Sequence, residues 1–184
     1  MDAAMLPAYP AELLDRARRI RLVGFDVDGT LTDGRLLYGT DGHEAKSFHV
    51  QDGMGLTLLR HAGIELALVT ARISPVVEQR GRELKIAHVH THERSKLACM
   101  QRIAAAMGIG MEAVAFMGDD LPDLAALRAA GLAIVPANAH PWAREAAHWV
   151  TPRRGGEGAA RDACDLLLHA QGRVEAILAH GEHP

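Results

Sequence analysis

The sequence contains little cysteine, with only Cys99 and Cys164 in a chain of 184 residues. The two lie far apart and lack the spacing of a metal site, which argues against a disulfide framework. No Cys/His set of the kind that holds zinc is evident either. We therefore expect both cysteines to be reduced thiols in the core of a cytoplasmic protein.

Basic residues are not in excess, because 20 Lys and Arg face 23 Asp and Glu and give a net charge of -3. This balance disfavours a nucleic-acid partner. No apolar run approaches the length that spans a bilayer, and Met1–Pro10 lacks the basic start and apolar run of a signal peptide. We expect no membrane association and one domain over residues 1–184.

Short apolar runs alternate with helical patterns along most of the chain. The runs predicted to be strands are Ile20–Phe25, Gly63–Val69, Ile86–Val89, Ala113–Met117 and Leu132–Val135. Helices are predicted from Ser74-Pro75 onward, over Ser95–Met107, and from Ala159 to about Ala170. This order predicts an α/β fold, a doubly wound, Rossmann-like parallel sheet with helices on both faces.

One segment breaks the alternation. Residues 34–50, with apolar arms around Leu36–Tyr38 and Ala45–Val50 and a turn at Gly39–Gly42, predict a β-hairpin inserted after the first strand. No insertion is large enough to form a separate domain that covers the sheet edge.

The sharpest motif is Asp26-Val27-Asp28-Gly29, which follows the first apolar run directly. It places two carboxylates at the carboxyl edge of a parallel sheet, where ligands bind in open α/β folds. Gly29 lets the backbone turn sharply and approach a ligand. A plain turn is the alternative, but a turn does not require two acids after a buried strand.

Gly118-Asp119-Asp120 repeats this arrangement after another strand. Asp120 alone is better explained as a helix cap, whereas Asp119 can face the same pocket as Asp26. Carboxylates from two neighbouring strands form a hard oxygen site that suits magnesium better than zinc.

Thr70 and Lys96 could complete a phosphate site. Thr70 ends a strand, so that its hydroxyl and the next backbone N–H groups, at Ala71 and Arg72, can bind phosphate oxygens. Lys96 lies near a helix start, where the dipole and the ammonium both favour an anion. Taken singly, Thr70 could be a strand-end cap and Lys96 a solvated charge.

The ordered set Asp26-x-Asp28, Thr70, Lys96 and Gly118-Asp119-Asp120 resembles the haloacid dehalogenase superfamily. The resemblance implies a phosphatase without a cap domain in which Asp26 is the nucleophile and Asp28 the general acid/base. It also implies that Thr70 and Lys96 hold phosphate, and that Asp26, Asp119 and the Asp28 carbonyl bind Mg2+.

Further motifs are similar to the subfamily that hydrolyses 3-deoxy-D-manno-octulosonate 8-phosphate in lipopolysaccharide biosynthesis. They are Thr32-Asp33-Gly34, Lys46-x-Phe48, Asp52-Gly53-x-Gly55, Val69–Arg72, Gly118-Asp119-Asp120-Leu121-x-Asp123, Ala137–Pro141 and Gly155-Gly156-x-Gly158-Ala159. This resemblance implies a small sugar-phosphate substrate and a homotetramer in which the C-terminal Gly-rich segment reaches a neighbouring active site. Thr32, Lys46, Arg72 and Gly156 are then candidates for substrate contacts.

Three alternatives remain open at this point: a phosphatase for a related nonulosonate 9-phosphate, a phosphotransferase, and a non-catalytic oligomerisation module. His88, His90 and His92 alternate along one segment and could imitate a metal site. Because no acid accompanies them in sequence, we expect ordinary surface or interface histidines.

Overall fold

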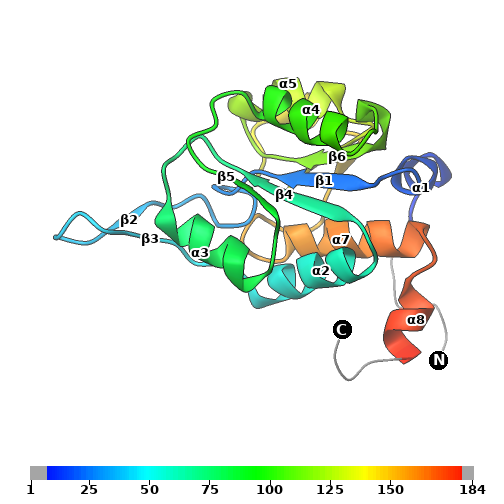
Figure 1. Ribbon diagram of the computed structural model, residues 1–184, viewed down its shortest axis with the longest axis horizontal. Coiled ribbons are helices and arrows are strands. Elements are labelled where there is room, and N and C mark those ends of the chain that lie inside the picture. The colour runs from blue at the N-terminus through cyan, green and yellow to red at the C-terminus, as the bar shows by residue number, and fades with distance from the viewer. Residues whose placement is uncertain (1–7, 180–184) are drawn as a thin grey trace.

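The computed structural model describes residues 8–179, and its centre is a six-stranded parallel sheet in the order β5-β4-β1-β6-β7-β8 (Figure 1). The strands are β1 Leu22–Phe25, β4 Glu65–Val69, β5 His88–His90, β6 Val114–Met117, β7 Leu132–Val135 and β8 Trp149–Val150. The predicted α/β class is confirmed, and five strands fall within about two residues of the predicted runs. The edge strand β8 was not predicted, because two residues carry no usable periodicity.

Helices cover both faces of the sheet (Figure 1). On one face lie α1 Ala11–Ala17, α2 Val50–His61, α3 Pro75–Glu83 and α7 Ala159–Ala170; on the other lie α4 Lys96–Ala106 and α5 Leu124–Ala129. Shorter elements are the 3-10 turns η2 Met111–Ala113 and η3 Leu121–Asp123, α6 Pro141–Glu145 and α8 Val174–Ala179.

Successive residues of the strands supply two separate cores. In β1, Val23 and Phe25 pack toward α2 and α7, whereas Leu22 packs toward α4 and α5. Every residue of β1, β6 and β7 is buried. This burial on both faces is typical of central parallel strands and fixes the height at which the strands end.

The predicted hairpin is present but shorter than expected. It consists of β2 Leu37–Tyr38 and β3 Glu44–Ala45, and it projects away from the sheet (Figure 1). The prediction that its second arm extends to Val50 is wrong, because α2 begins at Val50. From that point Asp52, Leu56 and Leu59 are buried at helical spacing, and this tertiary burial outweighs the local strand pattern.

Both cysteines are free and buried, as expected. Within residues 8–179, no helix is long and apolar enough to cross a membrane. Most of Met1–Pro10, where we expected no signal peptide, lies outside the described residues.

Candidate active site

The two acidic strand ends meet at the carboxyl edge of the sheet. Strands β1 and β6 are neighbours, with Phe25 opposite Met117, and the Asp26 N–H donates to the Met117 carbonyl at 2.8 Å. Asp26 and Asp119 therefore emerge side by side. Together with Asp123 they offer carboxylate oxygens within 4.8 Å of one another.

Asp123 was not among the predicted site residues. Its carboxylate Oδ2 accepts the backbone N–H groups of Asp119 at 2.9 Å and Asp120 at 3.1 Å, and Oδ1 accepts the Lys96 ammonium at 2.5 Å. It thus fixes the loop after β6 and ties it to α4. The sequence signal that could have found it is its place four residues after Asp119, on the first turn that follows the strand.

Lys96 lies at the centre of this cluster. It is the first residue of α4 and is only 5% exposed, and its Nζ lies 2.6 Å from Asp26 Oδ1 and 2.5 Å from Asp123 Oδ1. The helix begins here because Ser95 caps it, accepting the Ala98 N–H at 3.3 Å. Lys96 is therefore a buried, paired cation rather than a solvated surface charge.

The electrostatics of the cluster are dominated by crowded negative charge. Burial and then the nearby Asp123 raise the pKa of Asp119 to about 6, and the same causes raise the pKa of Asp26 well above its ordinary value. Burial alone would lower the pKa of Lys96, but Asp26 and Asp123 outweigh it and raise that pKa. Three carboxylates around one ammonium leave an excess of negative charge that a divalent cation would relieve.

The loop after β1 packs so closely against Asp119 that it requires glycine at position 29. Gly29 has a φ of +86°, and a Cβ there would lie 2.1 Å from Asp119 Oδ2, so only glycine fits. Thr32 is buried, and its hydroxyl receives the Gly34 N–H at 3.3 Å and faces the Val27 carbonyl at 3.4 Å. Thr32 therefore braces the loop, and its expected contact with substrate stays a prediction.

The Gly-rich segment lies on this same loop. A Cβ on Gly155 would come within 1.9 Å of the Gly29 carbonyl oxygen, and one on Gly156 within 2.5 Å of the Asp33 nitrogen. Asn138 bridges the two, donating to the Gly29 carbonyl at 3.0 Å and accepting the Gly155 N–H at 2.6 Å. The segment thus supports the loop of its own chain, and the expectation that it also reaches a neighbouring active site stays a prediction.

A second polar cluster lies at the mouth of the site. Lys46 donates to Asp28 and, at 3.0 Å, to Glu44, and its side chain is only 1% exposed. Arg72 Nη2 lies 3.1 Å from Glu44 Oε1 and 2.8 Å from the Tyr38 hydroxyl, while its Nε is 3.9 Å from Asp28 Oδ2. The structure therefore brings together Asp28, Lys46 and Arg72, and adds Glu44 and Tyr38, which the sequence analysis did not select.

Thr70 is buried at the end of β4, beside β1. Its hydroxyl accepts the Arg72 N–H at 3.2 Å, and its backbone bonds to His90 and Glu93. Ala71, which follows, is exposed. The Thr70 side chain therefore shapes the turn at Ala71 and Arg72.

The three histidines form no group of metal-binding geometry with other His, Cys, Asp or Glu residues in the described chain. The rings of His88 and His90 stack with centroids 6.2 Å apart on the edge strand β5, and His88 Nε2 lies 3.6 Å from Glu65. His92 adopts a φ of +57° in the turn after the strand.

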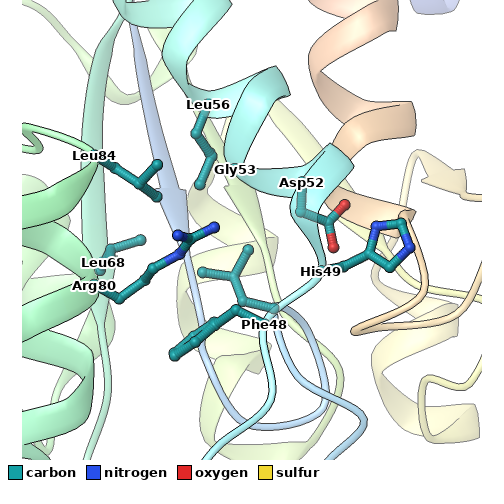
Figure 2. Close-up of a pocket in the computed structure, with 9 residues that line it drawn as sticks. Phe48, His49, Asp52, Gly53, Leu56, Leu68, Arg80 and Leu84 are labelled. Carbon is teal, nitrogen blue, oxygen red and sulfur yellow. The ribbon is translucent and has the colours of Figure 1, made fainter.

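A small pocket lies between α2 and α3, and none of Asp26, Asp119 and Asp123 lines it (Figure 2). Arg80 reaches into it above the Phe48 ring, 5.6 Å from the ring centroid, and a Cβ on Gly53 would lie 2.3 Å from Arg80 Nη2. Asp52, at one side of the pocket, accepts the Arg161 N–H at 2.8 Å and so joins α2 to α7. The pocket is therefore a gap in the packing between α2 and α3 and is not part of the acidic site.

Comparison with known proteins agrees with this geometry. Residues 82–161 match the family model of haloacid dehalogenase-like hydrolases. A relative from Escherichia coli K12, named 3-deoxy-D-manno-octulosonate 8-phosphate phosphatase, is 39% identical over 165 residues, which span 90% of this chain and 88% of the relative. The chain belongs to the haloacid dehalogenase-like hydrolases, in the family of these phosphatases.

Solved structures of this family are close in fold. The 3-deoxy-D-manno-octulosonate 8-phosphate phosphatase of Moraxella catarrhalis, determined with magnesium, phosphate and KDO, has a TM-score of 0.92 and 39% identity, covering 95% of this chain and 100% of the other. A hypothetical protein of Xanthomonas campestris has a TM-score of 0.95 and 52% identity, covering 99% and 100%.

Proposed function

We propose that this protein is a magnesium-dependent phosphatase that hydrolyses 3-deoxy-D-manno-octulosonate 8-phosphate to 3-deoxy-D-manno-octulosonate and phosphate, a step of lipopolysaccharide biosynthesis. The observation that carries the proposal is the buried cluster of Asp26, Asp119, Asp123 and Lys96 at the carboxyl edge of the sheet. The named phosphatases similar to the chain along nearly all its length supply the substrate.

The cluster fits a magnesium ion. Its donors are carboxylate oxygens, which hard divalent cations prefer, and its charge is negative even with Lys96 included. Asp26, Asp119 and the Asp28 carbonyl would hold the ion, while Asp123 is committed to Lys96 and two backbone N–H groups. When bound, Mg2+ neutralises charge on the phosphoryl oxygens.

Asp26 is the proposed nucleophile. Its carboxylate attacks phosphorus, the bond from phosphorus to the sugar oxygen breaks, and Asp28 gives its proton to the leaving oxygen. Water then attacks the aspartyl phosphate, Asp28 takes a proton from that water, and phosphate and free Asp26 result. Lys96 orients Asp26 throughout, and with the Thr70–Arg72 turn it receives the phosphate oxygens.

The second cluster lies where the sugar would extend from the phosphate. Lys46 and Arg72 place two cationic side chains beside Asp28, and their donors suit the carboxylate of a sugar acid. A nonulosonate 9-phosphate also carries a carboxylate and is the second candidate substrate. A cytoplasmic location, consistent with two free buried cysteines, belongs to this proposal.

We also propose a homotetramer assembled through the hairpins. Leu36, Leu37 and Tyr38 are 44%, 56% and 61% exposed, and an isolated two-stranded ribbon is marginal in water, so these side chains need a partner surface. Light scattering of the purified protein should give four times the chain mass, and a monomer would contradict this part of the proposal. The proposal includes the C-terminal Gly-rich segment, which begins at Gly155 and Gly156 beside the loop after β1 and is expected to reach the active site of a neighbouring subunit.

The test of function is phosphate release from a panel of sugar phosphates with Mg2+ and no added acceptor alcohol. The panel contains 3-deoxy-D-manno-octulosonate 8-phosphate, a nonulosonate 9-phosphate and neutral hexose phosphates. The highest kcat/KM is expected for the first compound. Preference for the nonulosonate would select the alternative substrate, release only with an acceptor would indicate a phosphotransferase, and no release from any compound would indicate a non-catalytic module.

A further inference from the structure

Glu44 is the one member of the second cluster whose charge has no part in the proposed reaction. It lies on β3, outside the catalytic motifs, yet its side chain is only 14% exposed. Its carboxylate Oε1 receives both the Lys46 ammonium at 3.0 Å and the Arg72 Nη2 at 3.1 Å. One oxygen atom therefore joins two cations that come from different segments of the chain.

The cations would not hold these positions by themselves. Lys46 follows the hairpin and Arg72 follows β4, and both are long side chains that lose much rotamer freedom when fixed. The bond from Arg72 Nη2 to the Tyr38 hydroxyl at 2.8 Å orients the guanidinium further. The hairpin thus places a carboxylate and a hydroxyl against Arg72, and both come from its two short strands.

We propose that Glu44 is a positioning residue that holds the partly exposed Arg72 guanidinium, directly and with the buried Lys46 behind it, so that Arg72 receives a carboxylate on the substrate. The inference rests on the proposed function and deepens it, because it assigns specificity for acidic sugar phosphates to the hairpin.

The charge pattern supports this assignment. Asp28 and Glu44 balance Lys46 and Arg72 one for one, so the cluster has no net charge to attract an anion from a distance. Recognition then depends on where the N–H donors point. Loss of Glu44 would leave the Lys46 and Arg72 side chains with one fewer anchor each and raise the entropic cost of binding.

The experiment compares Glu44→Gln with wild type on two substrates, the acidic sugar phosphate and p-nitrophenyl phosphate, which has no carboxylate. KM for the acidic substrate should rise about tenfold, the order of the cost of immobilising one long side chain. Both kinetic constants for p-nitrophenyl phosphate should stay within about twofold, since that ester has no carboxylate for the Arg72 side chain to bind. Glu44→Asp, which keeps the charge, should recover part of the loss.

Two controls separate the proposed role from a structural one. Glu175→Gln, on exposed α8, should change neither substrate. In an Arg72→Gln background, Glu44→Gln should have a smaller effect on KM than in wild type, because part of its action passes through Arg72.

Several results would overturn the inference. An equal loss for both substrates would show general damage to the site, and an unchanged KM would show that Glu44 positions nothing. A lower KM would show that Glu44 competes with the substrate for the two cations. A wild-type enzyme that hydrolyses p-nitrophenyl phosphate but no sugar phosphate that carries a carboxylate would instead refute the proposed substrate, and the inference with it.

Discussion

Replacing Asp119 by Asn should stabilise the metal-free protein at neutral pH while removing its response to Mg2+. Burial and the neighbouring Asp123 raise the pKa of Asp119 from 3.8 to about 6. A raised carboxyl pKa means that, between about pH 4 and pH 6, the native state binds more protons than the unfolded state. The free energy of unfolding contributed by Asp119 therefore falls as pH rises through this window.

The size of the effect follows from the shift. Two pKa units correspond to about 3 kcal/mol, and because Asp119 is partly exposed, solvent screening reduces the expected value to about 2 kcal/mol. The Asp119→Asn variant lacks this penalty, so near pH 7 without metal it should exceed wild type by about 2 kcal/mol, and near pH 4 the two should be nearly equal. Asp26, whose pKa is also raised, adds a fall of the same sign in both proteins.

The assay is urea unfolding in a chelating buffer at several pH values, repeated with Mg2+. At a concentration one hundred times its dissociation constant, Mg2+ should add about 2.7 kcal/mol to wild type and much less to Asp119→Asn. Asp15→Asn, which removes an exposed carboxylate near Arg18 on α1, is the control and should change stability little at any pH. A variant less stable than wild type at pH 7 without metal, or one with an undiminished response to Mg2+, would refute the reasoning.

Three further predictions concern catalysis. Asp26→Asn should abolish turnover with an unchanged circular dichroism spectrum, and near-normal turnover would exclude Asp26 as the nucleophile. A chelator should stop turnover and Mg2+ restore it, whereas Ca2+ should not, since its looser coordination misplaces the reacting groups; activity in a fully chelated sample would contradict the metal site. Gly155→Ala would bring a Cβ against the Gly29 carbonyl and should lower kcat at least tenfold. The control is Gly131→Ala, whose Cβ would collide in a similar way with the Glu112 carbonyl at the opposite edge of the sheet, and it should lower only the stability of the protein. An equal loss of kcat in both variants would show that the Gly155 contact has no special role in catalysis.

The site residues that can be predicted from the sequence are those that directly follow a predicted strand. Asp26 and Asp119 each follow an apolar run, and parallel strands deliver their carboxyl ends to one edge, so their proximity follows from fold class alone. The position of Lys96 at the start of a helix was likewise predicted from the sequence, and it is the first residue of α4.

The residues that escaped prediction depend on how loops fold back. Glu44 lies in the hairpin without any recognisable motif around it. The neighbouring sequence therefore does not indicate that β3 brings Glu44 to Arg72, 28 positions away. Gly155 and Gly156 resemble a flexible linker, and only the closeness of the Gly29 carbonyl shows that they are a packing surface. Val50 ends an apparent strand, but burial of the following residues makes it the first residue of α2.

The two polar clusters differ in net charge, and this difference suits them to bind different parts of the proposed substrate. The inner cluster of Asp26, Asp119, Asp123 and Lys96 carries excess negative charge and can accept a phosphate dianion only after a divalent cation reverses the local field. The outer cluster around Lys46 and Arg72 is balanced and exerts little long-range attraction, so it selects by geometry. Asp28 joins the two, because its backbone continues from Asp26 while its carboxylate bonds to Lys46. In the proposed mechanism, a ligand that occupies both clusters would place its leaving oxygen beside Asp28, and the correct sugar would be aligned for proton transfer in a way that free phosphate or a short ester is not.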